Sequence, residues 1–462
     1  MLGAALSAHA GNVTLYGSVD TGFMYKNHNV TANGNRLGVK ENSFKLADGL
    51  NGANKIGIRG EEDFGNATVG FKLENEFNLN NGDLEESNKL FQSEARLYVR
   101  NQFGELAAGR FGGLSSAAGS YNLFFKNADA FDGGDNAIPY AFAKSDRYDN
   151  SIAYQSPDIA GFQGTLMYSF QKKGSQSNKM TDNDRYVGAG LTYSQNSMTI
   201  VGVFEGQIRA NNTRNAHHKN GFTYSIGGNY DLGMAKIFVG AQWAHNTAFT
   251  DIQHGLNNKN VINNMIDQYG ENMLNQLDTY LGGLWQNVTP YNKIMSELNE
   301  IYNQYRSTQS NGIDRNEMIV FDNLGDPNQL RLGIRYNNNI NDEKAISPDL
   351  FKKIVKTTLP NIIQNQQYNG YALTLGSKIP LGTNEITIAG YMGEYKNAYD
   401  FLIKRKTSKI NIYGLDARYE YNLSKRTVLA IGGGIGQTRI NFASYKLKSR
   451  IAQTYVGLHH NF

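Results

Sequence analysis

The chain has 462 residues, a formal net charge of +4 and a polar mean hydropathy of −0.50. It contains no cysteine, which excludes disulfides, thiol nucleophiles and thiolate metal sites. No stretch of about 18 apolar residues occurs, which excludes a helical membrane protein, and no clustered basic arm suggests nucleic-acid binding.

The first ten residues, Met1 to Ala10, are similar to the end of a secretory signal peptide. Leu2 to Leu6 form a short apolar run, and Ala8-His9-Ala10 fits a cleavage site with small residues on either side of a variable one. We therefore expect residues 1–10 to be a residual signal peptide, with the mature chain starting near Gly11. The alternative is an unstructured terminus of small residues.

From residue 13 onward, the dominant pattern is an alternation of apolar residues with polar or small ones. In Thr454 to Phe462, every second residue is apolar over most of the segment, and the residues between them are mainly polar or small. Successive side chains of a strand point to opposite faces, so each such segment has one apolar face. That face packs on a second sheet in a soluble sandwich, whereas it contacts lipid in a membrane barrel.

The connections favour the barrel, because very short turns alternate with longer polar loops. The predicted turns are at 63–66, 102–104, 158–161, 195–196, 231–234, 381–384 and 422–425. The predicted loops lie near 27–53, 80–88, 112–147, 173–183, 210–219, 247–367, 397–407 and 438–449. Seven turns and eight loops predict sixteen strands, with the first (13–26) pairing with the last (450–462) so that no edge remains.

One predicted loop, residues 247–367, is far longer than an ordinary connection. Apolar residues at helical spacing predict helices at Asn260 to Leu281, Pro290 to Tyr305 and Pro348 to Gln364. Met318 to Phe321 and Gln329 to Tyr336 could form a hairpin between them. We expect a large, partly helical extracellular insertion; the alternative places that hairpin in the wall and gives eighteen strands.

Several short segments, in this order and spacing, resemble the general diffusion porins of Gram-negative bacteria, particularly the β-proteobacterial type. The segments that carry the resemblance are Leu15 to Gly22, Lys55 to Gly65, Phe103 to Arg110, Tyr148 to Tyr154, Leu423 to Thr427 and Val456 to Phe462. The resemblance covers most of the chain except the insertion.

The resemblance implies an all-β fold, a transmembrane antiparallel barrel of sixteen strands, with a homotrimeric assembly. It also implies that the third loop, 112–147, folds into the barrel and narrows it. The terminal Phe462 is similar to the signal read by the barrel-assembly machinery. The expected partners are therefore that machinery, further copies of the chain, outer-membrane lipid and lipopolysaccharide, and small hydrophilic solutes and ions.

A basic set is expected to line the constriction. Ile56, Ile58, Leu97 and Val99 take the lipid face by alternation, which turns the basic residues between them towards the lumen. The basic candidates are Lys55, Arg59, Arg96 and Arg100, with Arg147 and Lys144, where the loop rejoins the wall, as weaker ones. The resemblance assigns Lys55, Arg59 and Arg96 to the wall's basic cluster. Each of these could instead be an ordinary solvated strand charge.

An acidic set, Asp129, Asp132 and Asp135, lies in a stretch similar to the tip of the family's inward loop. Asp132 is inserted between Phe131 and the glycines, so the sequence leaves open which two aspartates face the basic wall. Each one could instead serve only to form the turn. Acids opposite bases would create a transverse field in the narrow part of the pore.

The predicted function is passive diffusion of ions and small hydrophilic solutes, filtered by size and charge, with a weak preference for anions. No catalytic motif, cofactor loop or metal-ligand spacing is present, so we expect no enzyme, cofactor or metal. The alternative is a ligand-specific or adhesive barrel in the outer membrane whose 247–367 insertion binds a partner or gates the pore.

Overall fold

The structure is a computed structural model. It describes residues 12–32, 35–86, 88–134, 140–211, 219–248, 318–322, 331–335, 343–365, 367–397, 409–442 and 445–462, with single positions 266, 267, 271, 274, 275, 278, 295, 298, 299, 302, 303 and 305. Residues 1–10, the expected signal peptide, and Asp135 therefore lie outside the described residues.

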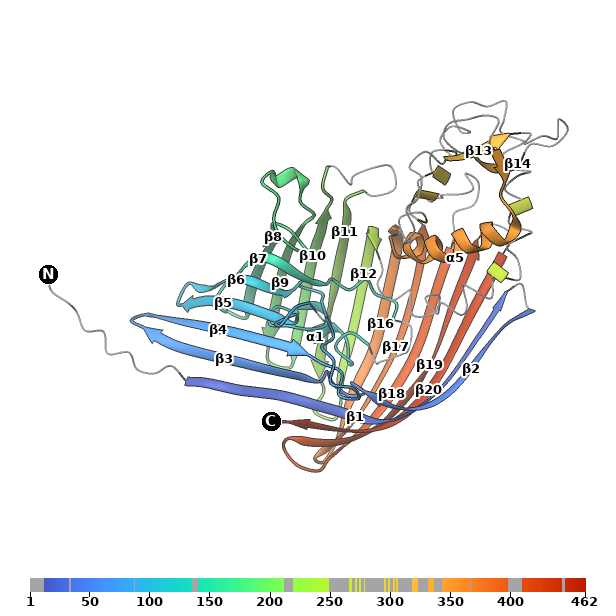
Figure 1. Cartoon of the computed structure of the whole chain (residues 1–462). Coiled ribbons are helices and arrows are strands. Elements are labelled where there is room, and N and C mark those ends of the chain that lie inside the picture. Colours follow the sequence, from blue (N-terminus) through green and yellow to red (C-terminus); the bar gives the residue numbers. More distant parts are fainter. Residues whose placement is uncertain are drawn as a thin grey trace.

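Antiparallel strands joined in one sheet form the wall (Figure 1). Its strands are β1 Asn12–Ala32, β2 Asn35–Asp48, β3 Lys55–Phe64, β4 Ala67–Glu76, β5 Glu94–Asn101, β6 Gly104–Gly112, β7 Arg147–Gln155, β8 Phe162–Ser169, β9 Arg185–Gln195, β10 Met198–Ile208, β11 Gly221–Asp231, β12 Lys236–Ala248, β16 Gln367–Leu381, β17 Asn384–Asn397, β18 Lys409–Asn422, β19 Thr427–Phe442 and β20 Tyr445–Asn461. A short 3-10 helix, η1 Met180–Asp182, lies between β8 and β9.

The first and last strands close the barrel. One edge of β1 pairs with β20, from Ser18 opposite Asn461 to Ala32 opposite Leu447. The other edge pairs with β3 in its first part and with β2 in its second part. Because β2 and β3 succeed one another along the same edge, the 17 strands of the sheet fill sixteen wall positions. This confirms the predicted closed barrel of sixteen strands.

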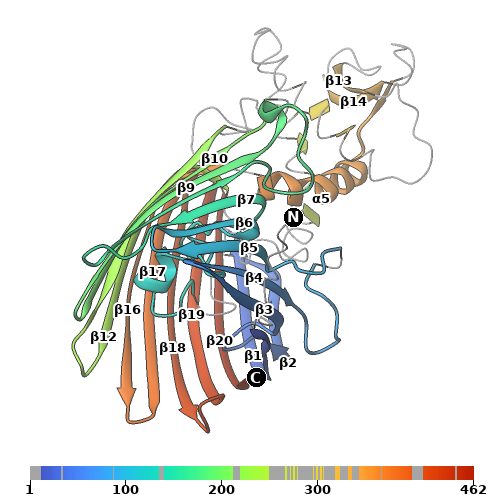
Figure 2. The same ribbon diagram turned by 90° about the vertical axis from the view of Figure 1, so that its left-hand side faces the viewer.

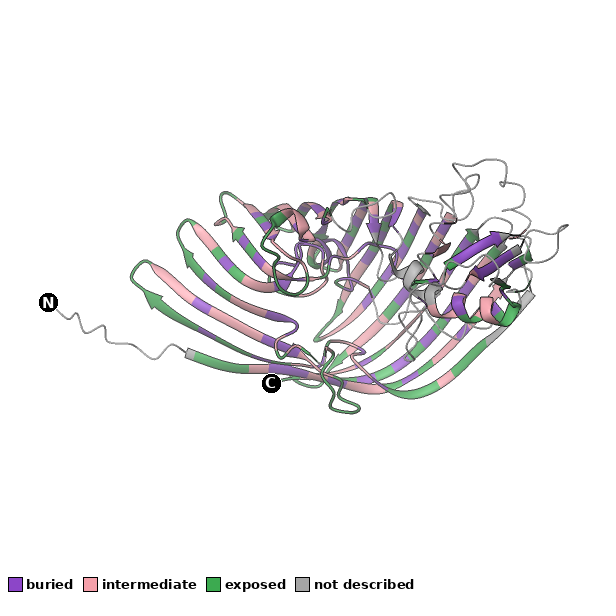
Figure 3. Ribbon diagram, turned by 45° about the horizontal axis from the view of Figure 1, so that its top comes forward, coloured by how far each residue is buried: buried purple, intermediate pink, exposed green. Residues whose placement is uncertain are grey.

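Side chains alternate across the wall as the sequence predicted. Ile56 and Ile58 are exposed on the outer face while Gly57 between them is buried, and Leu97 and Val99 are exposed on either side of buried Tyr98. Figure 3 shows this alternation as bands of buried and exposed residues along the strands. An apolar outer face suits the hydrocarbon of a membrane, where every backbone group must be paired within the wall.

All seven predicted turns lie between consecutive strands of the described wall, but two predicted loops are wrong. Residues 27–53 were expected to be a loop, yet β1 continues to Ala32 and β2 covers 35–48. Residues 438–449 likewise belong to β19 and β20, apart from the short turn between them. Backbone pairing does not require apolar side chains, so both hairpins continue beyond the apolar part of the wall as polar strands.

The insertion between β12 and β16 contains a small sheet of its own. The expected hairpin is present as β13 Met318–Asp322 and β14 Arg331–Arg335. A third strand, β15 Glu343–Ala345, joins them in a sheet separate from the wall, which rules out the eighteen-strand alternative. The helix expected at 348–364 is α5 Pro348–Asn365.

The insertion also has a hydrophobic core, which includes Leu274, Tyr302, Tyr305, Ile319, Phe321, Leu332, Ile334, Ile346 and Ile354. The described positions of the other two predicted helices are helical. The insertion lies above the ends of the long strands β16–β20 (Figure 2). No helix within the described ranges is long and apolar enough to cross a membrane.

Candidate functional site: the inward loop and the lumenal charges

The described part of the segment between β6 and β7, residues 113–134 and 140–146, runs along the inner face of the wall. It contains the short helix α1 Phe124–Ala128 (Figure 1), whose Phe124, Phe125 and Ala128 are buried. A Cβ atom at Gly240 of β12 would lie 3.2 Å from the Phe124 ring, and one at Gly376 of β16 would lie 2.8 Å from the Ala130 side chain. Glycines in the opposing wall therefore allow the loop to approach closely, as the expected inward fold requires.

Asp129 organises the tip of this loop. Its carboxylate accepts hydrogen bonds from the backbone N–H groups of Gly133 and Gly134, at 2.8 and 2.9 Å. It also accepts bonds from the hydroxyl groups of Tyr140, at 2.7 Å, and Tyr391 of β17, at 3.1 Å. Asp129 is buried. The structure thus places this predicted site residue inside the loop, where it shapes the tip and fixes it to the wall.

Asp132 is the aspartate of the described tip that is exposed. Its backbone is left-handed, with φ of 52°, which aspartate tolerates better than most residues. Asn122 donates a hydrogen bond to its carboxylate at 2.7 Å. Although the residue as a whole is exposed, desolvation of its carboxyl group by the surrounding protein raises the pKa to about 6. The bases acting most strongly on it are Lys378 of β16 and Lys126 of α1, neither in the predicted basic set.

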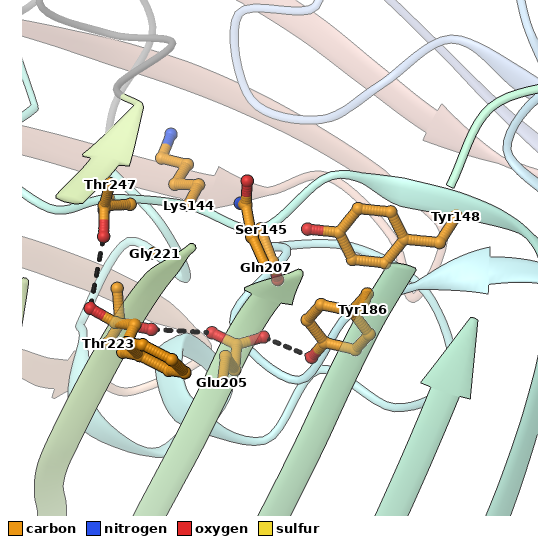
Figure 4. A pocket seen from close by; sticks show the side chains of 11 residues that line it. Lys144, Ser145, Tyr148, Tyr186, Glu205, Gln207, Gly221, Thr223 and Thr247 are labelled. Carbon is orange, nitrogen blue, oxygen red and sulfur yellow. Dashed lines mark hydrogen bonds between the residues drawn. The ribbon is translucent and has the colours of Figure 1, made fainter. Parts of the chain in front are cut away.

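A second buried carboxylate, Glu205 of β10, holds the root of the loop (Figure 4). It accepts hydrogen bonds from the Tyr186 hydroxyl at 2.5 Å and from the backbone N–H of Ser115 at 3.2 Å. The Tyr186 hydroxyl in turn accepts one from the Leu114 N–H at 3.1 Å. Glu205 and Tyr186 line a cavity of about 10 Å³, room for about one water. The loop is therefore fixed at its root and at its tip.

The basic wall is a ladder of alternating charges. Lys55 pairs with Glu74 at 3.5 Å, and Lys72 bridges Glu74 and Glu94 at 3.4 and 2.8 Å. Arg96 pairs with Glu94 at 2.8 Å and with Glu105 at 2.6 Å. The structure therefore brings the predicted Lys55 and Arg96 together through carboxylates on β4, β5 and β6.

The ladder continues to the periplasmic end of these strands. Arg100 pairs with Glu61 at 3.1 Å and lies 3.8 Å from Glu105. Arg147, at the start of β7, instead pairs with Glu76 of β4, and the Lys144 ammonium lies 4.6 Å from the centre of the Tyr140 ring. The ladder thus pairs four bases with four carboxylates: Lys55, Lys72, Arg96 and Arg100 with Glu61, Glu74, Glu94 and Glu105.

Arg59 differs from the other predicted bases. It is exposed to the lumen, and within the described residues it takes part in no ion pair. Its guanidinium lies 5.3 Å from the centre of the Tyr16 ring, in a cation–π arrangement. Arg59 is therefore the predicted base whose charge is least compensated.

The acidic half of the ladder was not among the predicted site residues. Glu61, Glu74, Glu94 and Glu105 accept the ion pairs described above, and Lys72 joins them. The signal was available, because alternation from Lys55, Arg96 and their paired strands places these residues on the lumenal face. On the opposite side, Arg418 of β18 lies 4.9 Å from the Phe131 ring and pairs with Glu420 at 3.2 Å. Among the described residues, no group of three or more histidine and acidic side chains is arranged to hold a metal ion.

Comparisons with known proteins agree with this architecture. The model of a family described as Gram-negative porin matches residues 1–337. An outer membrane porin protein of Bordetella pertussis is 27% identical over 246 residues, covering 49% of this chain and 62% of that protein. Outer membrane porin protein 32 of Delftia acidovorans is 28% identical over 252 residues, covering 51% and 64%. The chain thus spans less than two thirds of the length of these curated relatives.

Solved structures show a similar fold. An anion-selective porin from Comamonas acidovorans superposes with a TM-score of 0.50 at 17% sequence identity, covering 98% of this chain and 100% of that one. The outer membrane channel DcaP of Acinetobacter baumannii superposes with a TM-score of 0.53 at 11% identity, covering 99% of each chain. At these identities the likeness concerns the fold alone.

Proposed function

The chain belongs to the Gram-negative porin family, and from this premise we propose that it forms a passive diffusion channel for ions and small hydrophilic solutes across the bacterial outer membrane. The observation that carries the proposal is the inward loop, whose described residues 113–134 and 140–146 lie on the inner wall. Buried aromatic residues pack there, and Asp129 and Glu205 hold the loop. A loop fixed within a closed barrel narrows the lumen without closing it, and the narrowed lumen filters solutes by size.

Charge at the constriction supplies the second filter. Arg59 on one wall and Asp132 at the loop tip are predicted residues that are exposed and take part in no ion pair with the described residues. In a narrow lumen, such charges act on passing ions more strongly than they would in bulk water. The four bases of the ladder are matched by four carboxylates, and Arg59 adds a further positive charge to the same wall; we therefore propose a weak preference for anions.

The test is single-channel conductance of the purified protein in a planar bilayer under a salt gradient. We expect large, stepwise, ohmic openings and a reversal potential of the sign that indicates anion preference. A silent protein would overturn the diffusion channel. The proposed assembly is a homotrimer, and light scattering of the same detergent-purified sample tests it.

A second candidate function is supported by the insertion. Its core, around Phe321 and Ile334, packs the small sheet against its own helices, so it is a folded unit of its own. Such a unit at the extracellular mouth could bind a partner or gate the pore. Deleting the insertion separates these functions from that of an open pore, as described below.

A further inference from the structure

Six residues between β2 and β3, positions 49–54, interrupt the wall beside the first strand. Asp48 lies opposite Thr21 of β1, and Lys55 lies opposite Ser18. Only two positions of β1 separate Ser18 from Thr21, so four of the six residues exceed what a regular strand needs. Such an excess has to leave the sheet as a bulge. We call residues 49–54 the seam bulge, because β1 also pairs with β20 where the barrel closes.

The seam bulge lies on the inner faces of β1 and β20. Its Leu50 is buried in a cluster with Met24 of β1 and Tyr455 of β20. The chain neighbours of Met24 and Tyr455 are exposed on the outer face, so these two side chains point into the barrel. A Cβ atom at Gly457 would lie 3.0 Å from the Leu50 side chain, so this glycine leaves the space that Leu50 fills.

The inward loop is attached elsewhere on the wall. Its described residues donate hydrogen bonds to, or accept them from, Arg96 of β5, Gln242 of β12 and Tyr391 of β17. The seam bulge therefore projects into the lumen from a different part of the wall.

The seam bulge encloses the carboxylate of Asp20, which alternation places on the lumenal face of β1 together with Met24. This carboxylate accepts hydrogen bonds from the backbone N–H groups of Leu50, at 2.6 Å, and Asn51, at 3.0 Å. The His459 imidazole of β20 lies 3.2 Å from it, across the seam. Asp20 has 0% of its surface exposed. A carboxylate removed from water needs such donors, and the bulge supplies two of them.

The backbone of Asp20 shows how the wall accommodates the bulge. Its carbonyl oxygen accepts a hydrogen bond from the Gly49 N–H at 3.2 Å. Its N–H donates to the side-chain amide oxygen of Asn54 at 2.5 Å. Gly49 and Asn54 therefore stand at the two wall positions, and residues 50–53 are the four that leave it.

We propose that the seam bulge is a second selectivity element of the pore. It narrows the lumen beside β1 and β20, and it shields the negative charge of Asp20 from passing ions. Residues 49–54 carry no charged side chain, so they place a neutral surface next to the ladder residue Lys55, where an exposed carboxylate would repel anions. The proposal rests on the proposed function, because it assigns these residues a role in a diffusion channel.

The test removes the seam bulge and keeps the wall in register. Deleting residues 50–53 leaves Gly49 opposite Asp20 and Asn54 opposite Val19, so the side chains on both strands keep their faces. A matched control deletes Ser175 to Asn178, four uncharged, exposed residues of the loop between β8 and β9. Conductance and reversal potential are recorded in planar bilayers under a gradient of dilute salt, where charges are weakly screened.

We expect the bulge deletion to raise the conductance and to shift the reversal potential towards cations. Adding Asp20→Asn to this deletion should restore the original reversal potential and leave the conductance raised, while the control deletion should change neither. Unchanged conductance in the bulge deletion overturns the narrowing, and a shift that persists with Asp20→Asn overturns the shielding. A silent unmodified protein would instead overturn the proposed function.

A second measurement uses the full-length chain, in case the deletion does not fold. The chain has no cysteine, so Ala53→Cys, at an exposed position of the seam bulge, introduces a single thiol. Ser424→Cys, in the exposed turn between β18 and β19, is the control. We expect a bulky neutral thiol reagent to lower the conductance of Ala53→Cys and not that of Ser424→Cys. Complete labelling of Ala53→Cys with unchanged conductance would overturn the narrowing.

Discussion

The Tyr391 hydroxyl on β17 donates a hydrogen bond to the Asp129 carboxylate in the inward loop, across 262 positions of sequence and a distance of 3.1 Å. The same carboxylate holds Gly133, Gly134 and Tyr140. One buried acid therefore fixes both the shape of the loop tip and its attachment to the wall.

Replacing Asp129 by alanine should release the tip. We expect noisier single-channel currents and a free energy of unfolding lower by about 3 kcal/mol, because several buried donors lose a charged acceptor. Tyr391→Phe removes one of these bonds and should cost about 1 kcal/mol. Tyr413→Phe, at an exposed position on the outer face of the neighbouring strand, is the control. Wild-type noise and stability in Asp129→Ala would contradict the anchoring role.

Arg59 and Arg96 should behave differently when each loses its charge. Arg59→Gln should move the reversal potential towards cations and leave stability within about 0.5 kcal/mol, because Arg59 is exposed and makes no ion pair with the described residues. Arg96→Gln should also lower the free energy of unfolding by about 3 kcal/mol, since it leaves the buried Glu94 without one of its two bases. Reversal potentials and urea unfolding of both variants check this. An unchanged reversal potential in Arg59→Gln would exclude it from the selectivity filter.

Ion preference should depend on pH through Asp132. Its pKa is raised to about 6, so the carboxyl group is charged above that pH and neutral below it. As pH falls from 7.5 to 5, the loop tip loses negative charge, and the reversal potential should shift towards stronger anion preference with a midpoint of about 6. Asp132→Asn should abolish this shift, and its reversal potential should stay at the low-pH value across the whole pH range. The same pH dependence in that variant would show that another group titrates.

Deleting residues 249–366 and joining β12 to β16 by a short turn tests the role of the insertion. We expect the barrel to fold, because β12 and β16 already pair from Lys236 opposite Lys378. If the insertion is an accessory unit, conductance stays near its original value. A marked rise in conductance or a loss of voltage gating would instead identify it as a lid.

Phe462 offers a test of the assembly signal. Its backbone exchanges two hydrogen bonds with Gly17, at 3.0 and 3.2 Å. Phe462→Ala keeps these bonds, so we expect unchanged refolding in detergent and a several-fold lower amount of protein in the outer membrane of cells. Equal amounts in cells would exclude Phe462 as a signal.

The sequence by itself determined the barrel. Alternation with a period of two, together with seven short turns, predicts the strand number and the lipid-facing residues, because these depend on local backbone geometry. The even strand number in turn predicts the closure of β1 on β20, since it brings both ends of the wall to the same side of the membrane. The sequence also predicted the helix at 348–364 and the hairpin at 318–336, but mistook the polar ends of the first and last hairpins for loops. Polar strands and polar loops have the same composition.

Only the tertiary structure decided how the charges are used. Lys55 and Arg96 were predicted as part of a basic wall, yet Glu74, Glu94 and Glu105 neutralise them across neighbouring strands. Asp129 was one of three candidate aspartates, and the sequence left open which two of them face the basic wall; contacts with Tyr140 and Tyr391 bury it. Whether a charge faces solutes or another side chain depends on partners on other strands. The position of a residue along its own strand gives its face of the wall, but not the side chain with which it pairs.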